Sequence, residues 1–243
     1  MGKKAVIFDL DGTIYYGDTI IDGVYDVLDT LESKNFEIIF FTNNSSRNRK
    51  EIYKKLIDLD VKTSINSVYN SSYATSQYLI EKNIKNIYLI GTSSFKDELE
   101  NLSINVLEPK QAEAVVVGLN TQFCYEDIAQ GLEALNNGAL LIASNVDRNF
   151  PITKNDIKPA CNAIVSSLIG CLDTNIKPII IGKPNTYLLE IISKEKGLSK
   201  KDMWVVGDKE ESDIEMANRF GCNSILVGNN GINIKNIIER IVK

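Results

Sequence analysis

The segment of residues 6–13 constrains the fold more than any other part of the sequence. Its sequence, VIFDLDGT, is an apolar run that ends in Asp9 and Asp11, followed by Gly12. Because side chains alternate along a strand, we expect the two carboxylates to point the same way and Gly12 to let the backbone turn. Two carboxylates facing one spot are typical of a bound cation or of a shared proton. Taken alone, the segment also fits a strand followed by an ordinary Asp-rich turn.

The composition narrows the possible chemistry. The chain has 243 residues, of which 44% are hydrophobic, enough for a packed core in one large domain or two modest ones. It contains no histidine, which excludes a Ser-His-Asp triad, a Cys-His pair and a His-bound zinc. Acid–base chemistry must then come from carboxylates, lysines, tyrosines or cysteines. The net charge of -5, without a basic stripe, argues against nucleic acid as a partner.

The cysteines and the N-terminal sequence predict a cytoplasmic protein. The cysteines are far apart and form no C-x-x-C pair, as expected of small buried residues in a reducing compartment. They are Cys124, Cys161, Cys171 and Cys222. The sequence begins Met-Gly-Lys-Lys and leads directly into the first predicted strand, so we expect no signal peptide. No apolar run approaches the roughly 20 residues that span a bilayer, so we expect no membrane partner.

Short apolar runs alternate with helical patterns along the chain, which is typical of a parallel sheet covered by helices. The predicted strands are residues 6–9, 36–41, 87–90, 114–117, 140–143, 178–181, 203–206 and 224–227. The predicted helices are residues 24–31, 47–59, 73–81, 94–102, 125–136, 160–172, 185–196 and 213–220, with helical character in 234–242 and a loop at 14–23.

The alternation of strands and helices starts over near residue 71, which predicts two domains. We expect residues 1–73 and 176–243 to form an α/β core, Rossmann-like, with a parallel sheet. We expect residues 74–175 to form a smaller α/β domain inserted into that core. Because one domain interrupts the other, closure of the inserted domain over the core is a natural hypothesis.

Polar side chains follow several of the predicted core strands. They are Asp9, Asp11, Thr42, Asn43, Lys183 and Asp208. Ligands of open parallel sheets bind beyond the carboxyl ends of the strands, so these groups converge if the strands are neighbours. Each has a simpler explanation alone: Thr42 and Asn43 as a helix cap, Lys183 as a turn lysine. Their common position at strand ends favours a shared site.

Such a site suits phosphoryl transfer. Carboxylates alone repel phosphate, and Mg²⁺ reverses that repulsion because it takes oxygen ligands and phosphate together. Asp9 and Asp208 are the expected carboxylate ligands of Mg²⁺, with Asp213 supporting them. The backbone carbonyl of Asp11 is a further candidate ligand.

The remaining groups fit roles around a phosphate ester. Thr42 Oγ and the N–H of Asn43 are candidates to hold phosphoryl oxygens, and Lys183 to neutralise charge. Without histidine, the expected nucleophile is an aspartate that forms an aspartyl-phosphate. A partner aspartate would protonate the leaving alcohol and later deprotonate the attacking water.

Four motifs in this order resemble those of phosphatases of the haloacid dehalogenase (HAD) superfamily. They are D-L-D-G-T at 9–13, F-F-T-N-N-S at 40–45, I-G-K-P at 181–184 and V-G-D-x-x-x-x-D at 206–213. The resemblance covers nearly the whole chain and implies that Asp9 is the nucleophile and Asp11 the acid/base. In the same resemblance, Thr42 matches the functional residue of the second motif and Lys183 matches that of the third.

The predicted inserted domain is similar to the cap of the NagD-like or p-nitrophenyl phosphatase branch (class IIA, with a C2-type cap). The likeness lies in A-V-V-V-G-L at 114–119 and I-A-S-N-V-D-R-N-F-P at 142–151. Caps of this family help to choose the substrate, which makes Asn145, Asp147 and Arg148 candidate substrate residues. Caps of this branch can pair, which makes a homodimer through the cap a candidate assembly, although the sequence does not fix the oligomeric state.

The sequence departs from the branch pattern in four places. Asn120 stands where Asp is common, residues 209–211 replace a more apolar stretch, residues 160–162 replace a Pro-Gly-rich segment, and the tail after Gly228 is shortened. Because the core motifs are intact, these departures bear on substrate choice and cap geometry rather than on hydrolysis.

The sequence therefore predicts a Mg²⁺-dependent phosphatase acting on small phosphate monoesters such as p-nitrophenyl phosphate, sugar phosphates or nucleoside monophosphates. Two alternatives stay open: a phosphotransferase or phosphomutase on the same fold, and a protein that binds a phosphorylated ligand without turnover. A dinucleotide-dependent dehydrogenase fits poorly, because no G-x-G-x-x-G follows the first strand.

Overall fold

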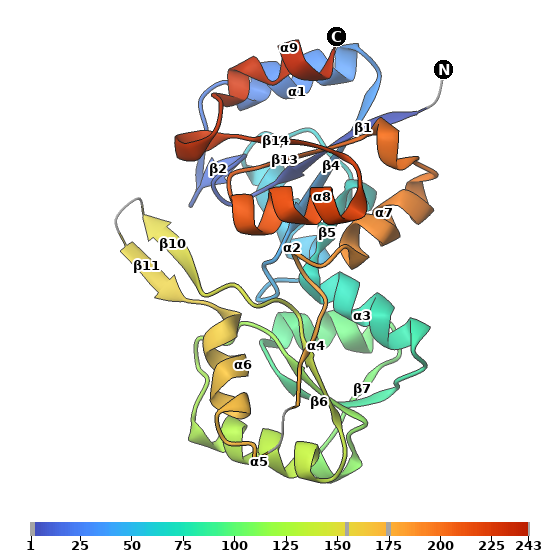
Figure 1. Ribbon diagram of the computed structural model, residues 1–243, viewed down its shortest axis with the longest axis vertical. Coiled ribbons are helices and arrows are strands. Elements are labelled where there is room, and N and C mark those ends of the chain that lie inside the picture. The colour runs from blue at the N-terminus through green and yellow to red at the C-terminus, as the bar shows by residue number, and fades with distance from the viewer. Residues whose placement is uncertain (1–2, 154–155, 174–175, 243) are drawn as a thin grey trace. The chain divides into compact units, whose positions relative to one another are not determined.

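The computed structural model describes residues 3–153, 156–173 and 176–242. The chain divides into two compact units, each described below by itself (Figure 1). The first unit comprises residues 1–42, 50–69 and 183–243. The second comprises residues 43–49 and 70–182. The domain borders expected at residues 74 and 175 stay predictions.

The first unit is built on a five-stranded sheet with strand order β14-β13-β1-β4-β5. The strands are β1 Lys4–Asp9, β4 Phe36–Thr42, β5 Val68–Asn70, β13 Met203–Gly207 and β14 Asn223–Leu226. The pairs β1–β4, β1–β13 and β13–β14 are parallel. The middle strands are apolar on both faces because helices cover both sides, as in other parallel sheets. The predicted parallel α/β core is confirmed, whereas β5 is a strand that the sequence analysis missed.

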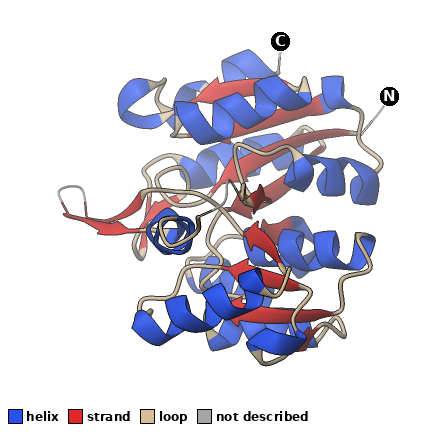
Figure 2. Ribbon diagram, turned by 60° about the horizontal axis from the view of Figure 1, so that its bottom comes forward, coloured by secondary structure: helices blue, strands red, loops and turns tan. Residues whose placement is uncertain are grey.

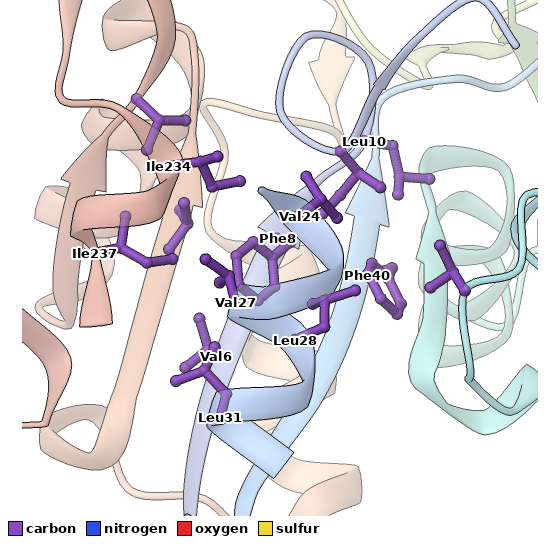
Figure 3. Close-up of a cluster of buried hydrophobic side chains, with 14 of the residues drawn as sticks. Val6, Phe8, Leu10, Val24, Val27, Leu28, Leu31, Phe40, Ile234 and Ile237 are labelled. Atoms are coloured by element: carbon purple, nitrogen blue, oxygen red, sulfur yellow. The ribbon is translucent and has the colours of Figure 1, made fainter. Parts of the chain in front are cut away.

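Helix α1 forms most of the core on one face of this sheet. Its buried residues recur every three to four positions and pack onto the inward-facing residues of β1 and β4 (Figure 3). The helices of this unit are α1 Val24–Ser33, α2 Arg49–Asp58, α7 Tyr187–Lys196, α8 Glu215–Phe220 and α9 Ile238–Ile241. Helices α7 and α8 lie on the opposite side of the sheet from α1 and α9 (Figure 1). The sheet is thus buried from both sides, and its strand ends become the natural place for polar groups.

The second unit has its own five-stranded sheet, with order β12-β9-β8-β6-β7 and every pair parallel. The strands are β6 Asn86–Ile90, β7 Asn105–Val106, β8 Ala114–Val117, β9 Leu140–Ala143 and β12 Ile179–Ile180. The helices are α3 Ser71–Glu81, α4 Ser93–Glu100, α5 Tyr125–Asn136 and α6 Cys161–Ile169. Figure 2 shows these helices packed around the strands. The prediction of a second α/β arrangement is confirmed.

One strand lies in a different sheet from the one expected. Residues 178–181 were predicted as a strand of the core, but β12 pairs with β9 of the second unit, Ile179 opposite Ile142 and Ile180 opposite Ala143. An apolar run indicates that a strand is buried, but it does not indicate which sheet the strand joins. The second unit therefore continues past β12 to Gly182, and Lys183 is the first residue of the segment 183–243 of the first unit.

The segment predicted as a loop at 14–23 contains a short antiparallel hairpin, β2 Tyr15–Tyr16 and β3 Thr19–Ile20. A second antiparallel hairpin, β10 Asn149–Thr153 and β11 Asp156–Pro159, was not predicted. Proline inside a strand removes a hydrogen-bond donor and argues against a strand in the sequence. Both strands of this hairpin contain a proline, Pro151 and Pro159.

All four cysteines are free thiols, but only Cys161 is buried. The expectation that the cysteines are buried is wrong for Cys124 and Cys171, which are exposed. Among the described helices, none has both the length and the apolar character needed to cross a membrane.

Glu37 joins β4 to α7 and yields a stability prediction. Lys196 Nζ lies 2.9 Å from one of its carboxylate oxygens and Lys3 Nζ lies 2.7 Å from the other. Burial alone would raise the pKa of Glu37, but the two ammonium groups lower it overall. We expect Glu37→Gln to lower the free energy of unfolding by about 0.5–1 kcal/mol at pH 7.

The sign of the pH dependence follows from the lowered pKa. The contribution of Glu37 is present above the unfolded-state pKa of about 4.3 and is lost as the pH falls through the lower folded-state value. Urea unfolding of the wild type and Glu37→Gln at pH 7 and pH 3 should show the difference only at pH 7. The exposed Glu32 provides the control Glu32→Gln, and an equal effect of both substitutions would contradict the assignment.

Candidate active site

Three neighbouring parallel strands end at the same edge of the first sheet. Asp9 is the last residue of β1, Thr42 is the last residue of β4, and Asp208 follows directly after β13. The register places Phe8 opposite Val206, so Asp9 and Asp208 leave the sheet nearly level. The topology thus brings polar groups from distant parts of the sequence to one edge of the sheet, as expected for residues that follow neighbouring parallel strands.

Lys183 binds two carboxylates at this edge. Its Nζ donates to Asp9 Oδ1 at 2.5 Å and to Asp213 Oδ1 at 2.6 Å. Lys183, Asp9 and Asp213 are 4%, 5% and 0% exposed, so water does little to screen these ion pairs. The ammonium also lies 4.3 Å from the ring centre of Phe41, a cation–π distance. Lys183 is therefore buried between two carboxylates and is not a solvated turn lysine.

Burial and neighbouring charges shift the pKa of Asp9 and of Lys183. Burial raises the pKa of Asp9 well above its ordinary value; Lys183 opposes this, and Asp213 and Asp208 add to it. Burial alone would lower the pKa of Lys183, but Asp213 and Asp9 more than reverse this and raise it. The raised pKa keeps Lys183 protonated, so one ammonium group faces the carboxylates of Asp9 and Asp213.

Asp213 is held on both of its oxygens. Oδ1 accepts from Lys183, and Oδ2 accepts from the backbone N–H of Lys209 at 3.1 Å. A π-helical turn, Glu210–Ile214, precedes α8 and carries Asp213 inward; such turns are frequent at functional sites. The helix predicted from residue 213 thus begins at Glu215. The carboxylate of Asp213 is a fixed counter-charge for Lys183.

Asp9, Asp208 and Asp213 each offer a carboxylate oxygen within 4.8 Å of the others. Asp208 Oδ1 is buried and, within the described part of the chain, has no hydrogen-bond partner. Burial and the charge of Asp213 raise the pKa of Asp208. Three carboxylates and one ammonium leave two negative charges uncompensated when all are ionised. Carboxylate oxygens in this number fit a small divalent cation such as Mg²⁺.

Two glycines give the carboxylates room. A Cβ on Gly12, whose φ is +97°, would overlap the carboxyl group of Asp208. A Cβ on Gly207 would likewise overlap the carboxyl group of Asp213. These glycines of the first and fourth motifs are therefore needed for close approach of backbone to carboxylate, in addition to the turn at Gly12.

Asp11 differs from its predicted placement. Strand β1 ends at Asp9, and the backbone then turns, with Leu10 O accepting the N–H groups of residues 13–15. The expectation that Asp9 and Asp11 belong to one strand is therefore wrong, and the strand period of two does not extend to Asp11. Among the described residues, the carboxylate cluster does not include Asp11.

Three of the remaining predicted residues, Asn43, Asn145 and Asp147, form a hydrogen-bonded cluster within the second unit. Thr42 is buried in the first unit, whereas Asn43 opens the segment 43–49 of the second. The Asn43 carbonyl accepts from Asn145 Nδ2 at 2.8 Å, and Asn43 Nδ2 donates to Asp147 Oδ1 at 3.1 Å. Arg148 is exposed. Of the three candidate substrate residues, two thus bind Asn43.

Sequence reasoning missed two residues of this cluster. Ser71 Oγ donates to the Asn43 carbonyl at 2.7 Å, and no feature of the sequence points to it. Gly182 packs so closely on Asn43 that a Cβ there would overlap Asn43 Oδ1. Its place in the I-G-K-P motif was the available signal.

Comparison with known proteins agrees with this geometry. The haloacid dehalogenase-like hydrolase profile matches residues 6–105, and a HAD-hydrolase-like profile matches residues 180–236. The chain belongs to the haloacid dehalogenase-like hydrolases, and it is an enzyme of the phosphoric monoester hydrolase class.

Its sequence relatives include HAD sugar phosphatases, and its structural neighbours include NagD and p-nitrophenyl phosphatase proteins. The chain is 32% identical to the sugar-phosphatase AraL of Bacillus subtilis, over 93% of this chain and 84% of the relative. It is 31% identical to the 5'-nucleotidase YutF of the same organism, over 92% and 86%. The structure of p-nitrophenyl phosphatase from Archaeoglobus fulgidus aligns with a TM-score of 0.87 at 28% identity, over 99% of this chain and 93% of that one.

The close contact at Gly207 gives a prediction about stability alone. We expect Gly207→Ala to lower the free energy of unfolding by about 1–3 kcal/mol, because the methyl group displaces the buried Asp213 carboxylate. In an Asp213→Ala background the same substitution should cost clearly less. Urea denaturation of the four proteins measures both costs, and equal costs in the two backgrounds would contradict the contact.

Proposed function

We propose that this enzyme hydrolyses small-molecule phosphate monoesters through an aspartyl-phosphate on Asp9, with Mg²⁺ as its cofactor. The observation that carries the proposal is the buried cluster in which Lys183 binds Asp9 and Asp213 while Asp208 Oδ1 has no hydrogen-bond partner in the described chain. Such a cluster needs additional positive charge, and it presents a carboxylate beside a cation. Both features suit attack on a phosphate.

The relatives support the substrate class. Their names include a sugar phosphatase, a 5'-nucleotidase and p-nitrophenyl phosphatases. We propose sugar phosphates as the first class to test, with nucleoside monophosphates as the second and p-nitrophenyl phosphate as a convenient chromogenic substrate. All three share a phosphomonoester group, which the core residues would recognise, and differ in the alcohol.

In the first half of the proposed reaction, Asp9 attacks phosphorus. Lys183 holds Oδ1 of Asp9, and Oδ2 forms the new bond to phosphorus. The bond between phosphorus and the ester oxygen breaks, and Asp11 gives its proton to the leaving alcohol. The products of this step are the free alcohol and a phosphorylated Asp9.

In the second half, Asp11 takes a proton from a water molecule, and the water oxygen attacks phosphorus. The bond from phosphorus to Asp9 breaks, which releases inorganic phosphate and restores both aspartates. Asp11 is less buried than Asp9, which suits a group that exchanges protons with the alcohol and with water.

The phosphoryl oxygens would be held by the end of β4 and by Lys183. Thr42 Oγ and the N–H of Asn43 belong to adjacent residues at that strand end. Because Asn43 Nδ2 binds Asp147, we assign the phosphate contact of Asn43 to its backbone N–H. These donors would stabilise negative charge that develops on the phosphoryl group.

A bound Mg²⁺ would be held by the carboxylates of Asp9 and Asp208 and by the carbonyl of Asp11, with Asp213 supporting. When bound, it supplies the positive charge that draws a phosphate into an acidic site. The uncompensated charge of the carboxylates fits this role.

We also propose that residues 74–175 act as a cap that helps to choose the substrate. Arg148 is exposed in the second unit and stays a candidate for contact with the substrate. Pairing of two copies through this domain stays a prediction.

The nucleophile is tested by Asp9→Asn. The amide cannot form the aspartyl-phosphate, so we expect p-nitrophenyl phosphate turnover to fall by about 10³-fold or more while circular dichroism stays unchanged. The exposed Asp26 supplies the control Asp26→Asn, which should keep wild-type turnover. Wild-type turnover by Asp9→Asn would refute the assignment.

The cofactor is tested by metal removal. We expect EDTA to abolish hydrolysis and added Mg²⁺ to restore it. At a Mg²⁺ concentration of about 100 times its dissociation constant, thermal unfolding should show about 2.7 kcal/mol of added stability. Asp208→Asn should lose this stabilisation, whereas the exposed control Asp58→Asn should keep it. Full activity in EDTA would contradict the role of the metal.

A further inference from the structure

The backbone of Asn43 is held by side chains of the second unit. Two donors converge on its carbonyl oxygen: Ser71 Oγ at 2.7 Å and Asn145 Nδ2 at 2.8 Å. Its side-chain Nδ2 donates to Asp147 Oδ1 at 3.1 Å. Asn43 is itself only 7% exposed. The residue after Thr42 is therefore fixed at both its main chain and its side chain.

The residues that hold Asn43 are themselves fixed. The backbone N–H of Asp147 donates to Asn145 Oδ1 at 3.1 Å, which closes the turn after β9. Asn145 is 3% exposed, and its Nδ2 lies 3.4 Å from Ser144 Oγ. Because the turn is locked internally, it presents the amide of Asn145 and the carboxylate of Asp147 to Asn43 in a defined geometry.

The backbone of Gly182 lies close to the side-chain oxygen of Asn43. A Cβ at Gly182 would lie 2.6 Å from Ser144 O and 3.1 Å from Asn145 Cβ, and it would overlap Asn43 Oδ1. The amide of Asn43 thus has the Asp147 carboxylate at its nitrogen and the Gly182 backbone at its oxygen. The hydrogen bond from Nδ2 to Asp147 orients the amide, and the Gly182 backbone limits the space at its oxygen.

We propose that Asp147, together with Asn145, is a positioning residue that sets the place of the Asn43 N–H. This inference rests on the proposed function, in which that N–H holds a phosphoryl oxygen. It replaces the expectation that both side chains face the substrate. Donors that stabilise a transition state lose their effect when displaced by about 1 Å, so a residue that fixes the donor controls the rate without touching the substrate.

The charge of Asp147 favours this assignment. A carboxylate facing a phosphate ester would repel it, whereas a carboxylate that accepts from an amide forms a strong, charge-assisted hydrogen bond. Asp147 accepts a hydrogen bond of this charge-assisted kind from the amide of Asn43.

The test compares Asp147→Ala with the conservative Asp147→Asn. We expect Asp147→Ala to lower kcat for p-nitrophenyl phosphate about 10-fold or more, with KM changed less than about threefold, because transition-state binding is lost. Asp147→Asn should stay within about threefold of the wild type, since its amide oxygen can still accept from Asn43. The exposed Asp97 supplies the control Asp97→Ala.

A double-mutant cycle with Asn43→Ala identifies the partner of Asp147. Asn43→Ala keeps the backbone N–H and removes the side chain that Asp147 binds, so Asp147→Ala should have no further effect in that background. Effects of the two substitutions that multiply, or an Asp147→Asn variant as damaged as Asp147→Ala with a raised KM, would show direct substrate contact and overturn the proposal.

Hydrogen exchange of the segment 43–49 separates this inference from the proposed function. Asp147→Ala should speed exchange in this segment several-fold relative to the wild type, and Asp97→Ala should not. If the wild type hydrolyses no phosphate ester, the proposed function fails, and the exchange result still decides whether Asp147 fixes the segment. Unchanged exchange in Asp147→Ala would overturn the positioning role.

Discussion

The ammonium group of Lys183 lies buried between the carboxylates of Asp9 and Asp213, and the arrangement of the core site depends on this contact. One buried cation cannot compensate three neighbouring carboxylates, and Asp208 Oδ1 is a buried oxygen left without a hydrogen-bond partner in the described chain. Buried charge without compensation is costly. The uncompensated charge is why we propose a divalent cation, which could bring a phosphate with it, at this site.

The strand order explains how distant residues meet. Strands β13, β1 and β4 are neighbours, so the ends of three chain segments lie together at one edge of the first sheet. Gly12 and Gly207 allow the backbone to approach the carboxylates of Asp208 and Asp213 closely. In the second unit, Asp147 and Asn145 hold Asn43. Thr42 ends β4 of the first unit, and Asn43 is the first residue of the segment 43–49 of the second.

The sequence predicted the parallel α/β class and most strands because the apolar runs are distinct and end abruptly. It predicted Asp9, Lys183 and Asp208 as site residues because all three end or follow predicted strands, and ligands of open parallel sheets bind beyond the strand ends. It could not assign 178–181 to a sheet, since burial pattern does not encode strand partners. It also could not show that Asp147 turns to Asn43, because that bond spans 104 residues and depends on tertiary packing.

The most direct test of the account is a crystal structure of the protein soaked with Mn²⁺, whose anomalous scattering locates a divalent cation. The account predicts one strong peak within bonding distance of the carboxylates of Asp9 and Asp208. A saturating Mn²⁺ soak with no peak there, or with its strongest peak away from this cluster, would contradict it.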